Sequence, residues 1–576
     1  VTGSITCSVD LDIEGDIDMA TGKKITWVNE NQYISGTATG NTAILISSNT
    51  GGSDPTGITL SCSSNASNIV IENAPLVLKK IQDYDMSDKN DKLYNVDGRL
   101  KWNGANLKTG VKRFAEYIAG RTGSGKVDGL TYIDENDEVV AWGDAEYNSI
   151  GLDLSLHAPG TTIPLPPDAI GVASKVYRTH NLLGILTSNN EMYFMGRNDL
   201  GQFSYVDGSI SATGYSVMKK CSVSNVKKIC FGTYSHIVTL YYVTNDGKLW
   251  AAGYNLKGVI GNGGTTTTGA SGAYLTQSSG VEDAVLIGDD GHETGLCLFT
   301  DGTVKTVGYG GYGQIGDGNT GDHNTWQSPV YDGGTTALAN IVEIQGCGYD
   351  NITTLYALDS SGVLYGWGTN AYGELSTGNQ TAQNKAVVIG SIGGLTITDF
   401  WACGSYAGNA LFVKYSNNKI YACGRNSIGQ LGLSAASVVT TLTEVTSLLT
   451  SYNIKEIILS GGSDTNLSHT FAITEDDRIL VSGNNTEGQC SMGTIVSLGA
   501  FELCYTILNN SGSPIKLKSG ISRNNPYIDL KHLASVGGQT FVISNNNDVY
   551  TCGYPRYYNG TIYNEYLYYL TRVKHW

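Results

Sequence analysis

The sequence VKTVGYGGYGQIGDG at residues 304–318 contains the pattern on which most of the chain is built. A short β-prone run ends in Gly308, and Gly313 follows five residues later with Gln314 directly after it. Five further copies keep this layout and two looser copies flank them: MYFMGRNDLGQFS (192–204), LWAAGYNLKGVIG (249–261), LYGWGTNAYGELS (364–376), IYACGRNSIGQLG (420–432), ILVSGNNTEGQCS (479–491), VVAWGDAEYNSIG (139–151) and VYTCGYPRYYNG (549–560). The chain therefore contains an internal repeat, and the fold is inferred from this repeat.

The first glycine of each copy recurs every 53–70 residues. These structural repeat glycines are Gly143, Gly196, Gly253, Gly308, Gly368, Gly424, Gly483 and Gly553. Ahead of each lies an apolar run, a turn rich in Asn, Asp or Gly, and a second alternating run, which is the pattern of a β-hairpin. In most copies an Asn follows two residues later, where its side chain can fold back on its own backbone. A glycine at the fifth position suits a left-handed turn without Cβ strain.

A period of about 50–60 residues, with strands and turns but no helix pattern, predicts radially arranged blades. A solenoid of the same period usually carries a helix in each repeat. We therefore expect an all-β protein: a β-propeller of seven or eight four-stranded blades, preceded by a small β-rich anchor or stalk domain.

The copies resemble the repeat of the regulator of chromosome condensation family, whose signature is an apolar residue followed by Trp-Gly-x-Asn-x-x-Gly-Gln-Leu-Gly. Residues 365–370 (YGWGTN) and 424–432 (GRNSIGQLG) carry this signature. The resemblance covers about residues 111–576 and implies a propeller, in which seven blades are usual. Because eight signatures are present and both end copies have a full hairpin, we favour eight blades; the alternative is that one end unit shares or leaves the ring.

The first part of the chain has a different texture. Short alternating runs at 4–18, 24–28, 43–47, 58–61 and 68–71 read as strands between polar turns. Each is too short to hold a core alone, so the segment needs to wind into a solenoid or to self-associate. We expect a β-rich anchor or stalk at 1–80, a linker or neck at 81–110, and the propeller at 111–576.

Two phrases in this first part are similar to phrases in tail-fibre and virion-surface proteins of phages and large DNA viruses. They are TGKKITWVNENQYISG (21–36) and KLYNVDGRLKWNG (92–104). The resemblance covers about the first 107 residues and implies a segment between a fibrous stalk, often trimeric, and a head. Residues 83–88 (DYDMSD) cluster carboxylates as a Ca²⁺ loop does, but they lack the glycine and distal glutamate of an EF-hand, so we read them as a solvated linker.

Composition excludes several classes of function. The net charge of −16 argues against binding nucleic acid by phosphate neutralisation. No run of 18 apolar residues is present, so we expect no membrane insertion. The eleven cysteines lack the spacing of a disulfide framework and are interpreted as small buried thiols, which fits synthesis in a reducing cytosol. The chain begins at Val1 without a leader pattern, so we expect that a segment was removed or that the native start lies upstream.

The stretches that follow the signature glycines are long and polar, at 265–277, 317–330, 377–385 and 434–440. Loops on one face of a rigid scaffold commonly carry recognition. Tyr312, Trp326 and Tyr372 lie in or beside these stretches, where they are expected to be stacking platforms for a sugar ring or a partner side chain. The alternative is that they cover blade edges. The Tyr-rich stretch 554–570 and Trp576 are expected to close the ring or pack on its rim.

Patterns of enzyme chemistry are missing from the sequence. The histidines and cysteines show no metal-ligand spacing, and no nucleophile elbow or phosphate-binding loop is present. His236 and His469 stand where the resembled family often has a structural histidine, so we expect packing or turn roles. We therefore predict no catalytic residue, no metal and no cofactor. A polysaccharide hydrolase would need two loop carboxylates to meet, for example among Asp317, Asp322 and Glu374.

Both resemblances together predict a non-enzymatic virion surface, decoration or tail-fibre protein of a phage or large DNA virus. Its propeller would bind a host-surface glycan or protein, and its N-terminal region would contact other virion proteins, with a homo-trimer as one expected form. We expect it on the virion surface after synthesis in the host cytoplasm. The alternatives are a cellular or secreted protein-interaction propeller and a polysaccharide-degrading fibre head.

Overall fold

The computed structural model describes residues 158–504 apart from gaps at 179–181, 232–238, 289–291, 350, 391, 406–407, 435, 446–447, 461–467, 477 and 493, together with separate strand segments on either side. The chain divides into two compact units, Val1–Leu107 and Lys108–Trp576. Each is described by itself below.

The first unit contains short antiparallel strands. β1 (Tyr33–Ile34) pairs with β2 (Ile46–Ser47), and β3 (Leu93–Val96), β4 (Arg99–Trp102) and β5 (Ala105–Asn106) form a three-stranded sheet. The expected strand at 43–47 overlaps β2. The expected strands at 4–18, 24–28, 58–61 and 68–71 and the acidic stretch 83–88 lie outside the described residues, and the division at residue 80 stays a prediction.

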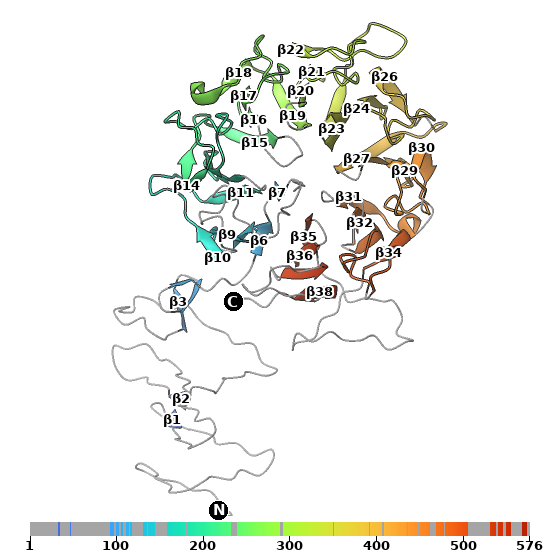
Figure 1. The fold of residues 1–576 in the computed structure, drawn as a ribbon. Coiled ribbons are helices and arrows are strands. Elements are labelled where there is room, and N and C mark those ends of the chain that lie inside the picture. Colours follow the sequence, from blue (N-terminus) through green and yellow to red (C-terminus); the bar gives the residue numbers. More distant parts are fainter. Residues whose placement is uncertain are drawn as a thin grey trace, which may run out of the picture. The chain divides into compact units, whose positions relative to one another are not determined.

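The second unit is a β-propeller of eight blades, which follow one another in chain order around a ring (Figure 1). Blade 1 consists, from the centre outward, of β6 (Val111–Phe114), β8 (Thr131–Asp134), β9 (Val139–Gly143) and β10 (Ala158–Ile163). Blade 2 consists of β7 (Glu116–Tyr117), β11 (Ala173–Arg178), β12 (Leu182–Thr187), β13 (Met192–Gly196) and β14 (Tyr215–Lys220). Blade 3 consists of β15 (Val226–Phe231), β16 (Thr239–Thr244), β17 (Leu249–Gly253) and β18 (Tyr274–Gln277).

Blades 4 to 8 repeat the same order of four strands. Blade 4 has β19 (Val281–Ile287), β20 (Thr294–Phe299), β21 (Val304–Gly308) and β22 (His323–Gln327). Blade 5 has β23 (Ile341–Tyr349), β24 (Ile352–Asp359), β25 (Leu364–Gly368) and β26 (Gln383–Ile389). Blade 6 has β27 (Ile397–Ser405), β28 (Gly408–Tyr415), β29 (Ile420–Arg425) and β30 (Val438–Glu444). Blade 7 has β31 (Ile454–Ser460), β32 (His469–Thr474), β33 (Ile479–Gly483) and β34 (Leu498–Leu503), and blade 8 has β35 (Leu530–Val536), β36 (Gln539–Ser544), β37 (Val549–Gly553) and β38 (Leu567–Arg572).

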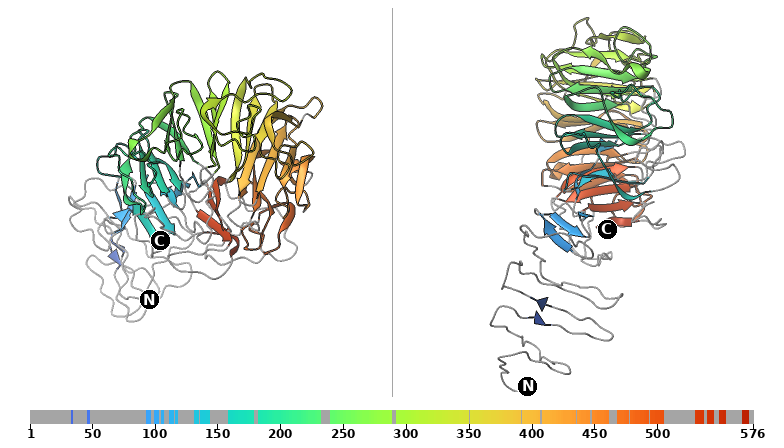
Figure 2. Two further views of the ribbon diagram at one scale, coloured as in Figure 1. Left: turned by 45° about the horizontal axis from the view of Figure 1, so that its top comes forward. Right: turned by 90° about the vertical axis from the view of Figure 1, so that its left-hand side faces the viewer.

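The expectation of eight blades is confirmed, with one difference in blade 2. The connection between β6 and β8 sends the two-residue strand β7 into the neighbouring blade, where it pairs in parallel with β11 and makes a fifth strand. Two 3₁₀ turns, η2 (Gly269–Ser271) and η3 (Leu448–Ser451), are the helical elements among the described residues. Figure 2 shows the ring from two further sides.

The hairpin turns form where the Asn, Asp and Gly clusters predict them. Gly247, Gly302 and Asn418 close the turns between the two central strands of blades 3, 4 and 6 with φ of +71°, +77° and +63°. Glycine and asparagine tolerate this left-handed conformation better than other residues do.

A bulge recurs at the start of the innermost long strand of each blade. There the register against the next strand shifts once, for example between Val281 and Asp283 in β19 and between Ile341 and Glu343 in β23. The same shift occurs in the other six blades. Bulges raise the local twist of a strand pair, and the repetition of this one shows that the blades share one geometry.

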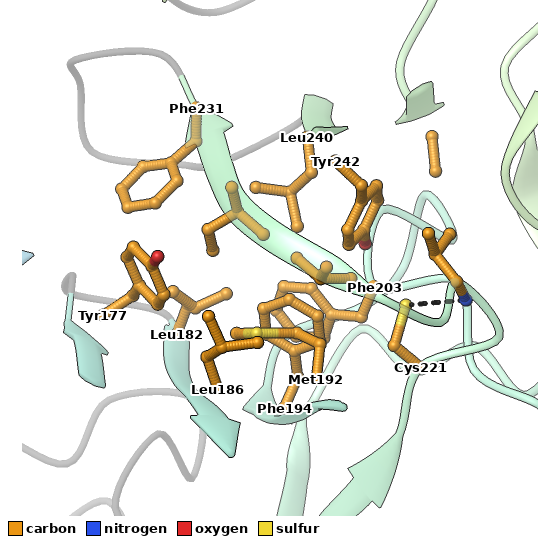
Figure 3. Close-up of a cluster of buried hydrophobic side chains, with 14 of the residues drawn as sticks. Tyr177, Leu182, Leu186, Met192, Phe194, Phe203, Cys221, Phe231, Leu240 and Tyr242 are labelled. Atoms are coloured by element: carbon orange, nitrogen blue, oxygen red, sulfur yellow. Dashed lines mark hydrogen bonds between the residues drawn. The ribbon is translucent and has the colours of Figure 1, made fainter. Parts of the chain in front are cut away.

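The core lies between the blades, because each sheet packs on both faces. β12, β16 and β32 are accordingly buried along their whole length. Figure 3 shows the cluster between blades 2 and 3, where the rings of Phe194 and Phe203 stack at 4.8 Å and Tyr242 of blade 3 meets Phe194 edge-on at 6.2 Å. The Cys221 thiol in this cluster accepts the Val223 N–H at 3.4 Å.

The cysteines behave as expected in the part of the chain that the structure describes. Eight of them are free thiols, and six of those are buried. Burial raises the pKa of the Cys221 and Cys552 thiols to about 12, so these groups stay protonated and unreactive.

The ring closes through inner strands. β6 of blade 1 contacts β35 and β36 of blade 8. Part of the Tyr-rich end forms β38, the outermost strand of blade 8, so it continues a blade rather than joining blade 8 to blade 1. Residues 554–566 and Trp576 lie outside the described residues.

Candidate binding surface

The connections that follow the repeat glycines, where the structure describes them, lie at one end of the blades. The strand that pairs with the outermost strand ends at its repeat glycine in seven blades and one residue later, at Arg425, in blade 6. The connection to the outermost strand starts there, whereas the turn that precedes this strand lies at its opposite end. We call the end with the connections the signature face. Its described connections are 197–214, 254–273, 309–322, 369–382, 426–434 with 436–437, and 484–497 without 493.

The repeat glycines adopt a conformation that other residues rarely adopt. Their φ values lie between +97° and +115°. In addition, a Cβ on Gly308 would lie 2.4 Å from the Glu293 carbonyl oxygen of the adjacent strand. The seven glycines with described φ values are Gly196, Gly253, Gly308, Gly368, Gly424, Gly483 and Gly553, and the eighth, Gly143, ends β9. They let each third strand leave its sheet.

The side chain of the repeated asparagine forms hydrogen bonds with the backbone of the connection that follows. The Asn370 Oδ1 accepts the Leu375 N–H at 2.9 Å, and its Nδ2 donates to the Asn379 carbonyl at 3.0 Å. The equivalent Oδ1 contact, to the N–H five residues ahead, measures 2.8–2.9 Å in the other four copies. The five side chains, Asn198, Asn255, Asn370, Asn426 and Asn485, are buried. The prediction that this side chain folds back on its own backbone is confirmed.

The repeated glutamine joins four of the blades to the blade that follows. The Gln314 Oε1 accepts the Tyr312 N–H at 2.8 Å, and its main-chain carbonyl accepts the Trp367 indole N–H of blade 5 at 2.9 Å. The carbonyls of Gln202, Gln430 and Gln489 likewise accept hydroxyl groups of the following blade, at 2.6–2.9 Å. These connections are therefore fixed both by hydrogen bonds within the same connection and by hydrogen bonds from the following blade.

Tyr312 presents an open ring on this face. Its residue is 44% exposed, and the ring lies 6.5 Å from that of Tyr309. Tyr309 meets His292 edge-on at 4.8 Å and is covered by the Lys257 Nζ of blade 3 at 5.6 Å. The same ammonium group pairs with Asp322 at 2.9 Å, so Tyr309 is enclosed and Tyr312 is open.

The other two predicted aromatic residues are engaged within the protein. Tyr372 is half-buried, and the Arg425 guanidinium of blade 6 lies 5.2 Å from its ring centre with Nη1 donating to the Tyr372 hydroxyl at 3.4 Å. Trp326 lies on outer strand β22 rather than in a loop, and its indole N–H donates to the Thr276 hydroxyl of blade 3 at 2.6 Å. It packs against the core of that blade and therefore joins blades 3 and 4.

The three loop carboxylates have separate partners. Asp317 pairs with His323 at 3.2 Å and Asp322 pairs with Lys257, whereas Glu374 is fully buried. Burial raises the pKa of Glu374 above its ordinary value. Within the described residues no group of three or more His, Cys, Asp or Glu is arranged to hold a metal ion.

The remaining predictions divide between the described residues and the rest. His469 is buried with its ring edge-on to Phe471 at 5.1 Å, so its expected packing role is confirmed, whereas His236 lies outside the described residues. Parts of the polar stretches 265–277, 317–330, 377–385 and 434–440 form outer strands β18, β22, β26 and β30, so they are shorter as loops than expected. A membrane-spanning helix is not found among the residues that the structure describes.

Comparison with known proteins gives related sequences but no matching family model. The chain is 28% identical to the ultraviolet-B receptor UVR8 of Arabidopsis thaliana over 312 residues, which are 53% of this chain and 64% of the receptor. It is 27% identical to the human E3 ubiquitin-protein ligase HERC2 over 303 residues, which are 44% of this chain and 6% of the ligase. It is 31% identical to the human X-linked retinitis pigmentosa GTPase regulator over 132 residues, 23% of this chain and 12% of that protein. The chain therefore spans less than two thirds of each relative.

Two solved structures resemble the fold at low identity. Human WBSCR16 has a TM-score of 0.46 and 16% identity, covering 64% of this chain and 94% of that one. Prp20p of Saccharomyces cerevisiae, the yeast RCC1 protein, has a TM-score of 0.45 and 14% identity, covering 68% and 88%. Repeat signatures, blades and related sequences agree. The second unit is a β-propeller whose repeats resemble those of RCC1-like proteins.

In this propeller, sequence reasoning missed four residues that shape the candidate surface. They are Lys257, His292, Tyr309 and Arg425, which surround the two tyrosines Tyr312 and Tyr372. A signal was present for two of them, because Tyr309 and Arg425 each follow a repeat glycine directly. Which side chains these residues contact could not be predicted from the sequence, because the contacts cross from one blade to the next.

Proposed function

We propose that this RCC1-like propeller is a non-enzymatic protein-interaction module that binds a partner protein through its signature face. The RCC1-like structures it resembles include one described as bound to Kap60 and one described with binding to Gsp1p and histones. The related sequences belong to a receptor, a ubiquitin ligase and a GTPase regulator. These likenesses support a recognition role in general, and the specific partner is part of the proposal.

The observation that carries the proposal is the exposed Tyr312 ring on a face whose loops are fixed by hydrogen bonds within the protein. A large aromatic ring on a fixed backbone offers contact area at a small cost in conformational entropy. The Gln314 side chain of the same connection and the Asn370 side chain of the next one form their hydrogen bonds within the protein. We therefore expect the exposed aromatic rings and charged groups of the signature face to contact the partner.

Site-specific photo-crosslinking tests which face binds. A photo-crosslinking residue at Thr320, exposed on the signature face of blade 4, is compared with one at Asn417, in the turn at the opposite end of blade 6. We expect one discrete adduct with a partner from extracts of the native source at Thr320 and none at Asn417, and unlabelled protein should compete for it. Equal labelling at both sites would contradict the proposal, and an adduct with polysaccharide would replace the protein partner by a glycan.

A second candidate function is that of a virion-surface or tail-fibre protein, in which the propeller binds the host surface. The observation that favours it is the pair of N-terminal phrases at 21–36 and 92–104. Quantitative peptide mass spectrometry on purified particles and on cell-free fluid tests it. Peptides from both units in a fixed ratio to capsid or tail proteins are the expected result, and recovery only in soluble or cellular fractions would leave the free interaction propeller.

A further inference from the structure

The repeat places a tyrosine and a cation together at one blade boundary. Tyr372 precedes the fifth-position glycine of blade 5, and Arg425 directly follows the repeat glycine of blade 6. Their side chains meet across the boundary, with the guanidinium 5.2 Å from the ring centre and Nη1 on the tyrosine hydroxyl. Gly408 leaves room beneath the pair, because a Cβ there would lie 2.4 Å from the Arg425 Cδ and 3.1 Å from the Tyr372 ring.

A second boundary holds the same pair with the two partners exchanged. At the boundary of blades 3 and 4 the cation, Lys257, precedes the fifth-position glycine, and the ring, Tyr309, follows the repeat glycine. The Lys257 Nζ lies 5.6 Å from the centre of the Tyr309 ring. The protein therefore uses the same two repeat positions twice to stack a cation on a tyrosine.

The boundary between these two carries the ring without the cation. Tyr312 of blade 4 is equivalent to Tyr372, since each precedes the fifth-position glycine. The position equivalent to Arg425 is Thr369 in blade 5, which is uncharged, buried, and 3.0 Å from the Thr354 hydroxyl. None of the cation–ring contacts among the described residues involves Tyr312, and its ring stays open.

We infer that Tyr312 receives an arginine side chain of the partner protein, which completes at this boundary the contact that Arg425 makes at the next one. The inference rests on the proposed function and names the partner's chemistry. A guanidinium is favoured over an ammonium because its plane stacks on a ring while its N–H groups reach the tyrosine hydroxyl. The net charge of −16 favours approach of a cationic partner.

The first experiment compares a charged probe with its neutral copy on the full chain. A fluorescein-labelled peptide of alternating glycine and arginine is titrated by fluorescence anisotropy at physiological salt, against the same peptide with citrulline in place of arginine. Citrulline keeps the shape of arginine but lacks its charge. We expect measurable binding of the arginine peptide and at least tenfold weaker binding of the citrulline peptide.

Substitutions then locate the binding. Tyr312→Leu should weaken binding of the arginine peptide about two- to fivefold, the range for cation–ring contacts at exposed sites. Tyr331→Leu is the matched control, because Tyr331 has the same exposed fraction of 44% but lies beyond β22, outside the signature connections, and it should bind as the unchanged protein does. Thr369→Arg places a cation where Arg425 stands in the next blade, so it should cover Tyr312 and weaken binding as Tyr312→Leu does.

Equal affinity of Tyr312→Leu and the unchanged protein, or equal affinity for the arginine and citrulline peptides, would overturn the inference. So would a complete lack of binding of the arginine peptide. These results leave the proposed function standing on its own test, because photo-crosslinking at Thr320 captures a partner of any chemistry. The opposite combination is also distinguishable. If no adduct forms at Thr320 but the arginine peptide still binds at Tyr312, the proposed function fails while the arginine contact stands.

Discussion

Glu374 departs from the repeat at a single buried position. Four other copies have glutamine there, and the Glu374 Oε2 still accepts the Tyr372 N–H at 2.8 Å. Its Oε1 accepts the Thr354 hydroxyl at 3.0 Å and the Asn409 side-chain N–H at 3.2 Å, so both oxygens of the Glu374 carboxyl group accept hydrogen bonds. These hydrogen bonds favour the carboxylate, but burial outweighs them and raises the pKa of Glu374.

This pairing predicts a pH dependence of stability. Burial raises the pKa of Glu374 in the folded protein above its unfolded value. The folded state then binds more protons than the unfolded state, so this contribution is complete below the ordinary pKa and is lost as pH rises through the raised one. We expect Glu374→Gln to match the unchanged protein at pH 4 and to exceed it at pH 8 by about 1 kcal/mol.

Thermal unfolding followed by circular dichroism between pH 4 and 8 measures the effect. Gln430→Glu, the reverse change in the next blade, is the matched control and should lower the Tm mainly at pH 8. Parallel curves of Tm against pH for the unchanged protein and Glu374→Gln would contradict the prediction, because they would show that folding does not change the pKa of Glu374.

At the scale of the element, the signature connection depends on how closely neighbouring blades approach. Gly313 has a φ of +83°, and a Cβ there would lie 2.5 Å from the Asn384 Cα of blade 5. Gly263, in the equivalent connection of blade 3, has the same φ of +83°, but a Cβ there meets nothing within 4 Å. Both positions require a left-handed backbone, but only Gly313 also lacks room for a Cβ, so comparing them separates the two effects.

We expect Gly263→Ala to cost only the left-handed conformation, about 1 kcal/mol. Gly313→Ala adds a clash with backbone atoms of the next blade, so it should cost about 2 kcal/mol more. Chemical unfolding of the two variants under one set of conditions gives the comparison. Equal losses of stability would mean that blades 4 and 5 separate enough to admit a methyl group.

At the scale of the whole molecule, the two units differ in the length and packing of the strands that the structure describes. The propeller closes through β6 against β35 and β36 and has a core between neighbouring blades. The strands that the structure describes in the first unit are two to four residues long. Strands this short need further partners to bury apolar surface.

We therefore expect the fragment 111–576 to be a soluble monomer and the full chain to associate through its first hundred residues, with a trimer as one expected form. Multi-angle light scattering on both gives their masses directly. An oligomeric fragment would contradict this assignment and would move the contact to the propeller.

The sequence by itself determined the repeat, the blade architecture and the roles of the recurring Gly and Asn residues. It could do so because these features depend on contacts within a few residues, such as the hydrogen bond from Leu375 N–H to Asn370 and the turn at Gly247. Eight signatures and two complete end hairpins were also enough to favour eight blades over seven.

Only the tertiary structure decided which side chains remain open for a partner. Trp326 looked like a loop aromatic, but it lies on β22 and is bonded to Thr276, 50 residues away. Tyr312 and Tyr372 occupy equivalent positions in sequence, and one is open while the other is covered by Arg425, 53 residues further along. The physical reason is that each signature connection packs against the neighbouring blade, so the state of a residue depends on a neighbour one full repeat away.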